Sequence, residues 1–173
     1  RLLADLGALA YASVAMVTLA VARDAVTRPL DASGFLVAAA DRLPTLTACS
    51  WASAKWAHLS DPETMILRVS AGRHGDTAAL DLRDDDLVDA MMTDLGTTMG
   101  IDGPPVHRRV TRWADGLPQF LPGHLGRVRR WRAHLDEVAS GLVLAGAAYD
   151  GLGIPACIRQ GRRAAEQAAT RTR

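Results

Sequence analysis

The residues whose types and spacing best suit chemistry lie near the C-terminal end. An uncharged apolar run, Leu142–Ala145, is predicted to form a short buried strand. Gly146, Gly151 and Gly153 follow it, and glycine allows backbone conformations and close approaches that are closed to other residues. Pro155 suits the first turn of a helix, where its missing N–H would have had no partner. Because the start of a helix carries a partial positive charge, the stretch predicts a site for an anion or an electron-rich oxygen.

Two other interpretations apply to this stretch. An ordinary strand, turn and helix that pack tightly would use the same residues, and on these residues alone that alternative stays open. The run Gly151–Ala156 also fits G-x-G-x-x-A, the dinucleotide fingerprint. That fingerprint requires a turn directly after the first strand, a second strand, and an acidic residue about 20 positions further on. Here Ala147–Asp150 intervene and one more helix is predicted, so the context excludes a Rossmann site.

Other arrangements that carry chemistry are not found in the sequence. The histidines at 58, 74, 107, 124 and 134 lack zinc-type spacing. No serine or cysteine lies in a G-x-S-x-G elbow, so a hydrolytic nucleophile is not indicated. The acidic run Asp84–Asp86 is better explained as the start of a helix, where carboxylates favour the positive end and one of them can cap it. We therefore expect no metal site.

The elements that would position the glycine-rich turn follow from apolar periodicity. Ser13–Val21 is uncharged and rich in β-branched residues, which predicts a central strand buried on both faces, preceded by the end of a helix. The sequence predicts further strands at 35–38, 46–53, 65–72 and 106–113, and helices from Asp84 to near Gly100, at 125–138 and after Pro155. This is an α+β fold, with a mixed sheet flanked by helices and then a strand and helix.

Composition places the chain among globular proteins. Of its 173 residues, 49% are hydrophobic and 23% charged, and the net charge of +1 indicates no nucleic-acid partner. The arginines at 127, 129, 130 and 132 are interpreted as a solvated helix face. Cys49 and Cys157 lack C-x-x-C spacing, which favours a reducing compartment and a cytoplasmic location. The uncharged residues 6–22 fall short of the roughly 20 needed to span a bilayer, so no transmembrane segment is expected, although peripheral membrane contact stays open.

A series of short segments occurs in the order found in one known family. They are Gly34–Val37, Leu67–Gly75, Val110–Trp113, Leu117–Phe120, Gly123–His124, Gly146–Ile158 and Gly161–Ala165. Together they resemble the FAD-dependent protoporphyrinogen and coproporphyrinogen oxidases, which belong to the flavin amine-oxidase-like superfamily. The resemblance spans nearly the whole chain and is strongest from residue 110 onward.

The resemblance implies a domain arrangement and an activity. Residues 1–109 would be the C-terminal part of a substrate-binding domain, and 110–173 the C-terminal segment of an FAD-binding domain. The family's N-terminal half, whose GxGxxG sequence grips the adenosine diphosphate of FAD, would be missing, so the isolated chain is expected to be inactive. The implied reaction is the oxygen-dependent oxidation of coproporphyrinogen III or protoporphyrinogen IX in haem biosynthesis, with hydride transfer to FAD and formation of H2O2.

The resemblance also implies which residues contact the cofactor. The family's turn that matches Leu152, Gly153 and Ile154 lies against the flavin, and the tryptophan that matches Trp113 is a flavin neighbour. Gly146 is expected to admit the cofactor. The alternative for Trp113 is a core tryptophan at the end of a strand. No catalytic residue is carried over, because the family's substrate contacts lie largely upstream of this chain.

Two other functions stay open at this point. One is another flavin amine-oxidase-like enzyme, of the amine oxidase or carotenoid desaturase type, although the run Trp113–Phe120 is closer to the porphyrinogen oxidases. The other is a non-catalytic interaction domain whose glycine turn only packs.

Arg68 and Arg73 would suit the propionates of a porphyrinogen, since a guanidinium pairs well with a carboxylate, or they form surface ion pairs.

Overall fold

The computed structural model describes residues 2–38, 40–41 and 43–171, and the chain divides into two compact units. Unit 2 is Ala12–Gly116, and unit 1 combines the chain up to Tyr11 with the chain from Leu117 onward. Strands β1 (Tyr11–Ala22) and β5 (His107–Pro118) each cross a boundary between the units. The domain boundary expected after residue 109 stays a prediction, and residues 1, 172 and 173 of those domains lie outside the described part.

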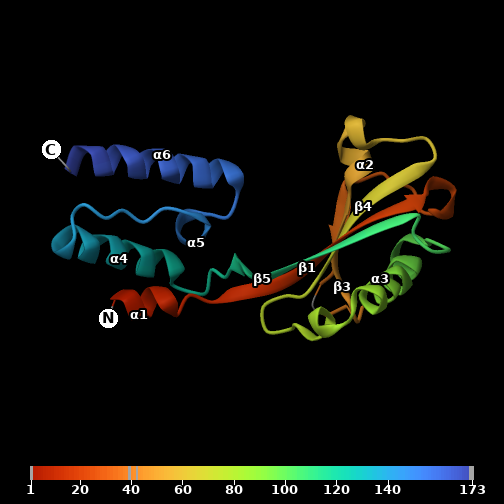
Figure 1. Cartoon of the computed structure of the whole chain (residues 1–173), viewed down its shortest axis with the longest axis horizontal. Coiled ribbons are helices and arrows are strands. Elements are labelled where there is room, and N and C mark those ends of the chain that lie inside the picture. The colour runs from red at the N-terminus through yellow and green to blue at the C-terminus, as the bar shows by residue number, and fades with distance from the viewer. Residues whose placement is uncertain (1, 39, 42, 172–173) are drawn as a thin grey trace. The chain divides into compact units, whose positions relative to one another are not determined.

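Unit 2 is built on a five-stranded sheet with the order β2-β3-β4-β1-β5 (Figure 1). Its other strands are β2 (Gly34–Leu36), β3 (Leu46–Trp51) and β4 (Thr64–Ala71). The pairs β1/β4, β2/β3 and β3/β4 are all antiparallel. The α+β class is thus confirmed, but these pairs are not the mixed sheet that was expected. Antiparallel neighbours need only short connections, whereas a parallel pair needs a long crossover.

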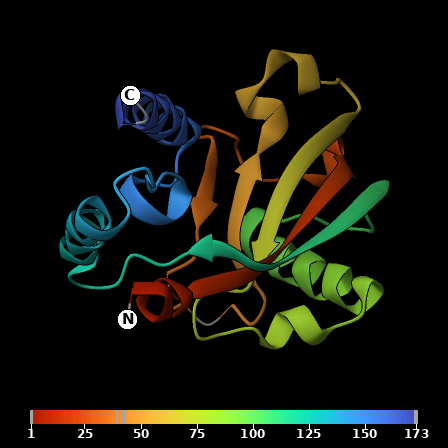
Figure 2. The ribbon, with the colours of Figure 1, turned by 60° about the vertical axis from the view of Figure 1, so that its left-hand side comes forward.

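Helix α3 (Asp84–Met99) covers one face of this sheet (Figures 1 and 2). Its apolar side chains recur at helical spacing, and the fully buried ones include Leu87, Met91 and Leu95. They pack against alternate residues of the strands, such as Val17 of β1 and Leu67 of β4. This helix and its end near Gly100, which is left-handed at the C-cap, agree with the sequence prediction.

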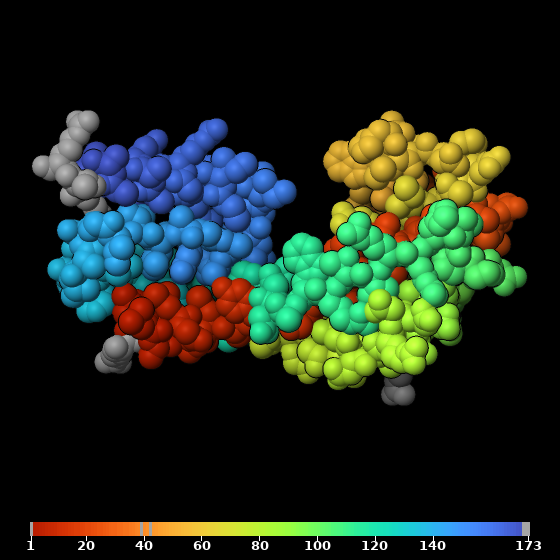
Figure 3. Space-filling model, viewed as in Figure 1, coloured from red at the N-terminus to blue at the C-terminus, as the bar shows by residue number. Residues whose placement is uncertain are grey.

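Carboxylates in the first turn of α3 form ion pairs with β5 and do not cap the helix. The N-cap is Arg83, which makes no capping hydrogen bond from its side chain. Asp85 accepts from Arg108 of β5 at 2.7 Å, and Asp84 pairs with Arg112 of the same strand. Figure 3 shows β5 and α3 adjoining on one face of unit 2. The acidic run therefore starts a helix, as expected, but its carboxylates serve ion pairs.

Strand β1 is fully buried on only one face, a correction to the strand buried on both faces that the sequence predicted. Along β1 and β4, fully buried residues alternate with less buried ones. The buried set faces α3, whereas the other face of the sheet carries partly exposed side chains such as Met16 and Thr18. Apolar composition alone does not separate a half-covered strand from a covered one.

Short elements complete unit 2. They are the 3-10 helices η1 (Arg23–Ala25), η2 (Ala57–Leu59) and η3 (Ala78–Asp81), and the single-turn helix α2 (Ala52–Lys55) between β3 and β4. Cys49 of β3 belongs to the core, and its burial raises the pKa of the thiol to about 12. This cysteine is therefore an apolar core residue and not a reactive thiol.

Unit 1 is helical. It contains α1 (Leu2–Gly7), α4 (His124–Val138), α5 (Ala147–Asp150) and α6 (Ile154–Arg171), with α5 between α4 and α6 (Figures 1 and 2). The strand expected at Leu142–Ala145 was wrong: these residues form no strand, and Leu142 is 61% exposed. A strand needs a neighbour to complete its hydrogen bonds, and no pairing is described here. In α4, Val128, Trp131 and Leu135 are buried, while Leu125 and Val138 of the expected apolar stripe are exposed.

Candidate functional site

The glycine-rich turn forms a bend between α4 and α6 that contains the one-turn helix α5. Gly146 (φ 132°) begins α5 and Gly151 (φ 140°) ends it, and both angles are readily adopted only by glycine. The Cys157 N–H donates to the Gly153 carbonyl at 3.0 Å, which opens α6, and Pro155 lies in its first turn as predicted. The sequence did not predict α5, because four residues between glycines are too few to show a helical period.

Gln160, which the sequence analysis missed, ties the two ends of this bend together. Its side chain is buried on α6; its Oε1 accepts from the Gly146 N–H at 3.2 Å, and its Nε2 donates to the Gly151 carbonyl at 3.4 Å. Each hydrogen bond gives a partner to a backbone group that is not paired within a helix or a strand. A glutamine one turn beyond the predicted helix start was the only signal that could have revealed this role.

A second set of contacts fixes α5 from the side of α4. The buried His124 donates from Nε2 to the Tyr149 carbonyl at 2.9 Å, because a carbonyl can only accept. Its ring stacks on Phe120 with centroids 4.3 Å apart, and its Nδ1 has no partner in the described part of the chain. Gly123–His124 had been noted only as part of a family pattern, and the structure gives the histidine a positioning role.

Arg132 and Asp150 form the ionic part of this support. Arg132 Nη1 and Nη2 donate to Asp150 Oδ1 and Oδ2 at 3.1 and 2.6 Å, and Nη2 also donates to the Leu144 carbonyl at 3.3 Å. These hydrogen bonds from Arg132 lower the pKa of Asp150. Burial raises the pKa of the neighbouring Tyr149. Arg132 therefore belongs to the site and not to a solvated helix face.

The outer side of the bend is open in unit 1. Leu152 is 50% exposed and Ile154 is 77% exposed. A Cβ placed on Gly146 would meet nothing within 4 Å, and one on Gly153 would meet only Pro155 Cδ at 3.8 Å, an ordinary contact. Among the described residues, no backbone or side-chain acceptor is found for the N–H groups of Ile154 and Ala156. The bend thus presents apolar surface and free donors at a helix N-terminus.

These features fit the pyrimidine end of a flavin ring. That end carries carbonyl oxygens and ring nitrogens that accept hydrogen bonds, and it gains negative charge when the flavin is reduced. Free N–H groups at the start of α6 suit such a charge, while Leu152 and Ile154 offer apolar contact to a flat ring. The four expected cofactor residues Gly146, Leu152, Gly153 and Ile154 all belong to this bend.

Trp113 lies in β5 of unit 2, apart from that bend in the sequence. It is 55% exposed, so it is not the core tryptophan of the alternative interpretation. It lines a cavity of about 320 Å³ with Leu80 and Arg112, and Arg112 is held by Asp84. The strand is sharply turned just beyond it, where Asp115 has φ 48° and its backbone N–H donates to Ser13 Oγ at 2.9 Å. The Trp113 side chain is therefore only partly covered by its neighbours in unit 2.

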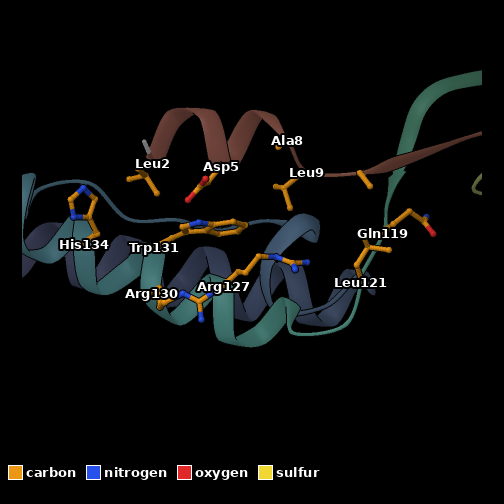
Figure 4. Close-up of a pocket in the computed structure, with 11 residues that line it drawn as sticks. Leu2, Asp5, Ala8, Leu9, Gln119, Leu121, Arg127, Arg130, Trp131 and His134 are labelled. Carbon is orange, nitrogen blue, oxygen red and sulfur yellow. The ribbon is translucent and has the colours of Figure 1, made fainter.

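A further cavity in unit 1, of about 510 Å³, was not predicted. It lies between α1 and α4, and Figure 4 shows the Trp131 ring between these helices. Leu2 and Leu9 supply apolar walls, and Arg127 and Arg130 supply positive charge.

In the part of the chain that the structure describes, no group of three or more His, Cys, Asp or Glu residues could hold a metal ion. No described helix has the length and apolar character to cross a membrane.

The chain belongs to a family of flavoenzymes. The sequence profile of the family described as "Flavin containing amine oxidoreductase" matches residues 3–169. This match covers nearly the whole chain, including both units, the bend and Trp113. The family resemblance deduced from the short segments is confirmed.

Two individual relatives of this chain are coproporphyrinogen III oxidases. The chain is 35% identical over 158 residues to the coproporphyrinogen III oxidase of Bacillus subtilis, and 39% identical over 166 residues to that of Mycobacterium leprae. These alignments cover 91% and 96% of this chain but 33% and 35% of the relatives. The chain therefore spans about a third of the length of the relatives that it matches.

Two solved structures share the fold of this chain. A crystal structure assigned as a protoporphyrinogen oxidase, from Exiguobacterium sp. 255-15, superposes with a TM-score of 0.79 at 30% identity. It covers 98% of this chain and 37% of the other. Reduced UDP-galactopyranose mutase shares the fold at a TM-score of 0.58 and 12% identity, over 78% of this chain and 28% of that one.

Proposed function

We propose that this chain supplies the flavin-contacting bend of an FAD-dependent porphyrinogen oxidase. The observation that carries the proposal is the open bend at the start of α6, which offers exposed apolar side chains and N–H donors that have no acceptor among the described residues. Family membership supports a flavin as the ligand. The curated relatives of this chain are named coproporphyrinogen III oxidases, which supports a porphyrinogen as the substrate.

Each residue of the bend has a distinct role in this proposal. The N–H groups of Ile154 and Ala156 donate toward the electron-rich edge of the ring, and the dipole of α6 favours negative charge there. Gly153 admits the ring because it has no side chain, and Leu152 contacts the ring face. When bound, FAD would supply the chemistry: it takes hydride equivalents from the porphyrinogen and is reoxidised by O2, which becomes H2O2.

The remaining parts of the proposal concern the whole protein. Trp113 is a second flavin neighbour and Gly146 admits the cofactor. Residues 1–109 belong to a substrate-binding domain and residues 110–173 to an FAD-binding domain. The product is the porphyrin for haem biosynthesis, with coproporphyrinogen III or protoporphyrinogen IX as substrate, and the reaction takes place in the cytoplasm.

The absorption spectrum of the purified holoprotein tests this proposal. We expect a flavin band at about 450 nm that is bleached anaerobically by coproporphyrinogen III or protoporphyrinogen IX and not by benzylamine. Absence of the band would contradict a flavoenzyme and favour an interaction domain. Bleaching by benzylamine alone would favour an amine oxidase.

A further inference from the structure

The face of the sheet that α3 does not cover carries its own ordered set of side chains. Antiparallel pairing aligns Thr18 of β1 with Arg68 of β4, and Arg68 with Ser50 of β3. The neighbouring row joins Met16, Ser70 and Ala48 in the same way. Residues directly opposite each other in a sheet point to the same side, so these two rows lie on one surface.

This surface is the floor of a cavity of about 510 Å³ within unit 2. Such a volume lies within the roughly 300–1,000 Å³ that is usual for small-molecule sites. One wall is formed by the chain around β2, from Ser33 to the strongly exposed Leu36, and another by Lys55 at the end of α2. The floor contributes Met16 and Ala48 as apolar contacts and Ser50 and Ser70 as hydroxyls.

Among the residues that the structure describes, two cations and no carboxylate line this cavity. Lys55 Nζ donates to Ser50 Oγ at 2.8 Å, which holds the ammonium group against the floor. Arg68 is exposed and lies beside Ser50 in the sheet register. Among the described residues neither cation has an acidic partner, whereas Arg108 and Arg112 of β5 are both paired with aspartates. The cavity thus combines an apolar floor with uncompensated positive charge.

We propose that this cavity binds a broad, largely apolar ligand through its carboxylates, with Arg68 and Lys55 as the carboxylate-binding residues. The choice of ligand rests on the proposed function: a porphyrinogen is a broad, largely apolar macrocycle that carries carboxylates on side chains at its edge. A guanidinium receives a carboxylate through paired hydrogen bonds, and Lys55 adds a second point charge. Lys55 and Arg68 both lie beside Ser50, so together they suit two carboxylates of one ligand, which both a tetracarboxylate and a dicarboxylate macrocycle supply.

Equilibrium binding of stable porphyrins to the holoprotein tests this inference without turnover. We expect coproporphyrin III and protoporphyrin IX each to bind more tightly than coproporphyrin tetramethyl ester, which has no free carboxylate. Arg68→Gln and Lys55→Gln should each weaken coproporphyrin binding by about tenfold, the usual size of one lost charge-assisted hydrogen bond. Both variants should leave ester binding and flavin content unchanged, and Arg68→Lys should recover part of the loss.

Arg73→Gln is the matched control, because Arg73 follows the same strand but does not line the cavity. The inference is overturned if the tetraacid binds no better than its ester, if no porphyrin binds, or if Arg73→Gln weakens binding as much as Arg68→Gln. Tight, Arg68-dependent binding in a protein whose flavin band coproporphyrinogen does not bleach would refute the proposed reaction and leave this cavity intact.

Discussion

Gly151 and Gly153 are two residues apart but meet different surroundings. A Cβ on Gly151 would lie 3.2 Å from Ala156 Cβ, in a backbone conformation (φ 140°) that costs other residues about 1–3 kcal/mol. Gly153 has no such conformation, and only an ordinary contact with Pro155. The local structure therefore explains why Gly151 is glycine, while none of the described residues requires Gly153 to be small. A ligand beside the bend would supply that requirement.

We predict that Gly153→Val abolishes flavin retention and leaves the fold of the protein largely intact. The valine side chain would occupy the space assigned to the ring, whereas its cost to the helix start is about 1 kcal/mol or less. The flavin-to-protein ratio and the far-UV circular dichroism measure the two effects. Gly151→Ala is the control and should lower the melting temperature through the strained turn. Normal flavin content in Gly153→Val would refute the contact.

The ion pair between Arg132 and Asp150 predicts a pH dependence. The hydrogen bonds from Arg132 lower the pKa of Asp150 below 3.8, so the carboxylate stabilises the folded state at pH values above 3.8. That contribution is lost as the pH falls through the lowered pKa. Asp150→Asn should therefore reduce the urea midpoint at about pH 6 and have little effect at about pH 2. An equal effect at both pH values would show that the charge is not what stabilises α5.

At the scale of elements, a buried carboxylate of α3 forms hydrogen bonds with the backbone at the start of β3. Asp94 Oδ2 accepts from the N–H groups of Thr45 and Leu46 at 3.0 and 2.8 Å. Asp94→Ala would leave both donors buried without a partner, at a cost of about 1–3 kcal/mol each. We expect a clear loss of thermal stability for Asp94→Ala. Asp94→Asn should lose much less, because the amide oxygen can accept in the same place. Equal losses would assign the effect to charge.

The elements that the sequence predicted well are those whose side chains carry their own period. The apolar spacing of α3, the uncharged runs of β1 and β3 and the alternating apolar residues of β4 were sufficient, because packing of one face against a neighbouring element produces such a pattern. The strand at Leu142–Ala145 was wrong because an apolar run does not say whether a pairing strand is present. Helix α5 was missed because its supports, His124, Arg132 and Gln160, are distant in sequence and become neighbours only in the fold.

At the scale of the molecule, the sequence predicted the family but not the unit 2 cavity that Arg68 and Lys55 line. Short segments such as Trp113–Phe120 and Gly146–Ile158 keep their order along the chain, so they can be recognised without a fold. The cavity with Arg68 and Lys55 depends instead on the register of three strands, which no single segment contains. Arg68 could be suggested as a propionate partner from its chemistry alone, but the role of Lys55 required the fold, which brings its ammonium group to Ser50.

Stability of the whole protein should depend on flavin concentration if the bend contacts the cofactor. A ligand that binds only the folded state stabilises it by RT ln(1 + [L]/Kd), about 2.7 kcal/mol at a hundredfold excess over Kd. We predict that removing FAD lowers the melting temperature, and that adding FAD back restores it in proportion to the logarithm of its concentration. Gly153→Val should melt at the temperature of the flavin-free protein whether or not FAD is added. Arg68→Gln, which alters only the carboxylate-binding cavity, should respond to FAD as the unaltered protein does. If Gly153→Val gained as much stability from FAD as the unaltered protein, the cofactor would be held elsewhere.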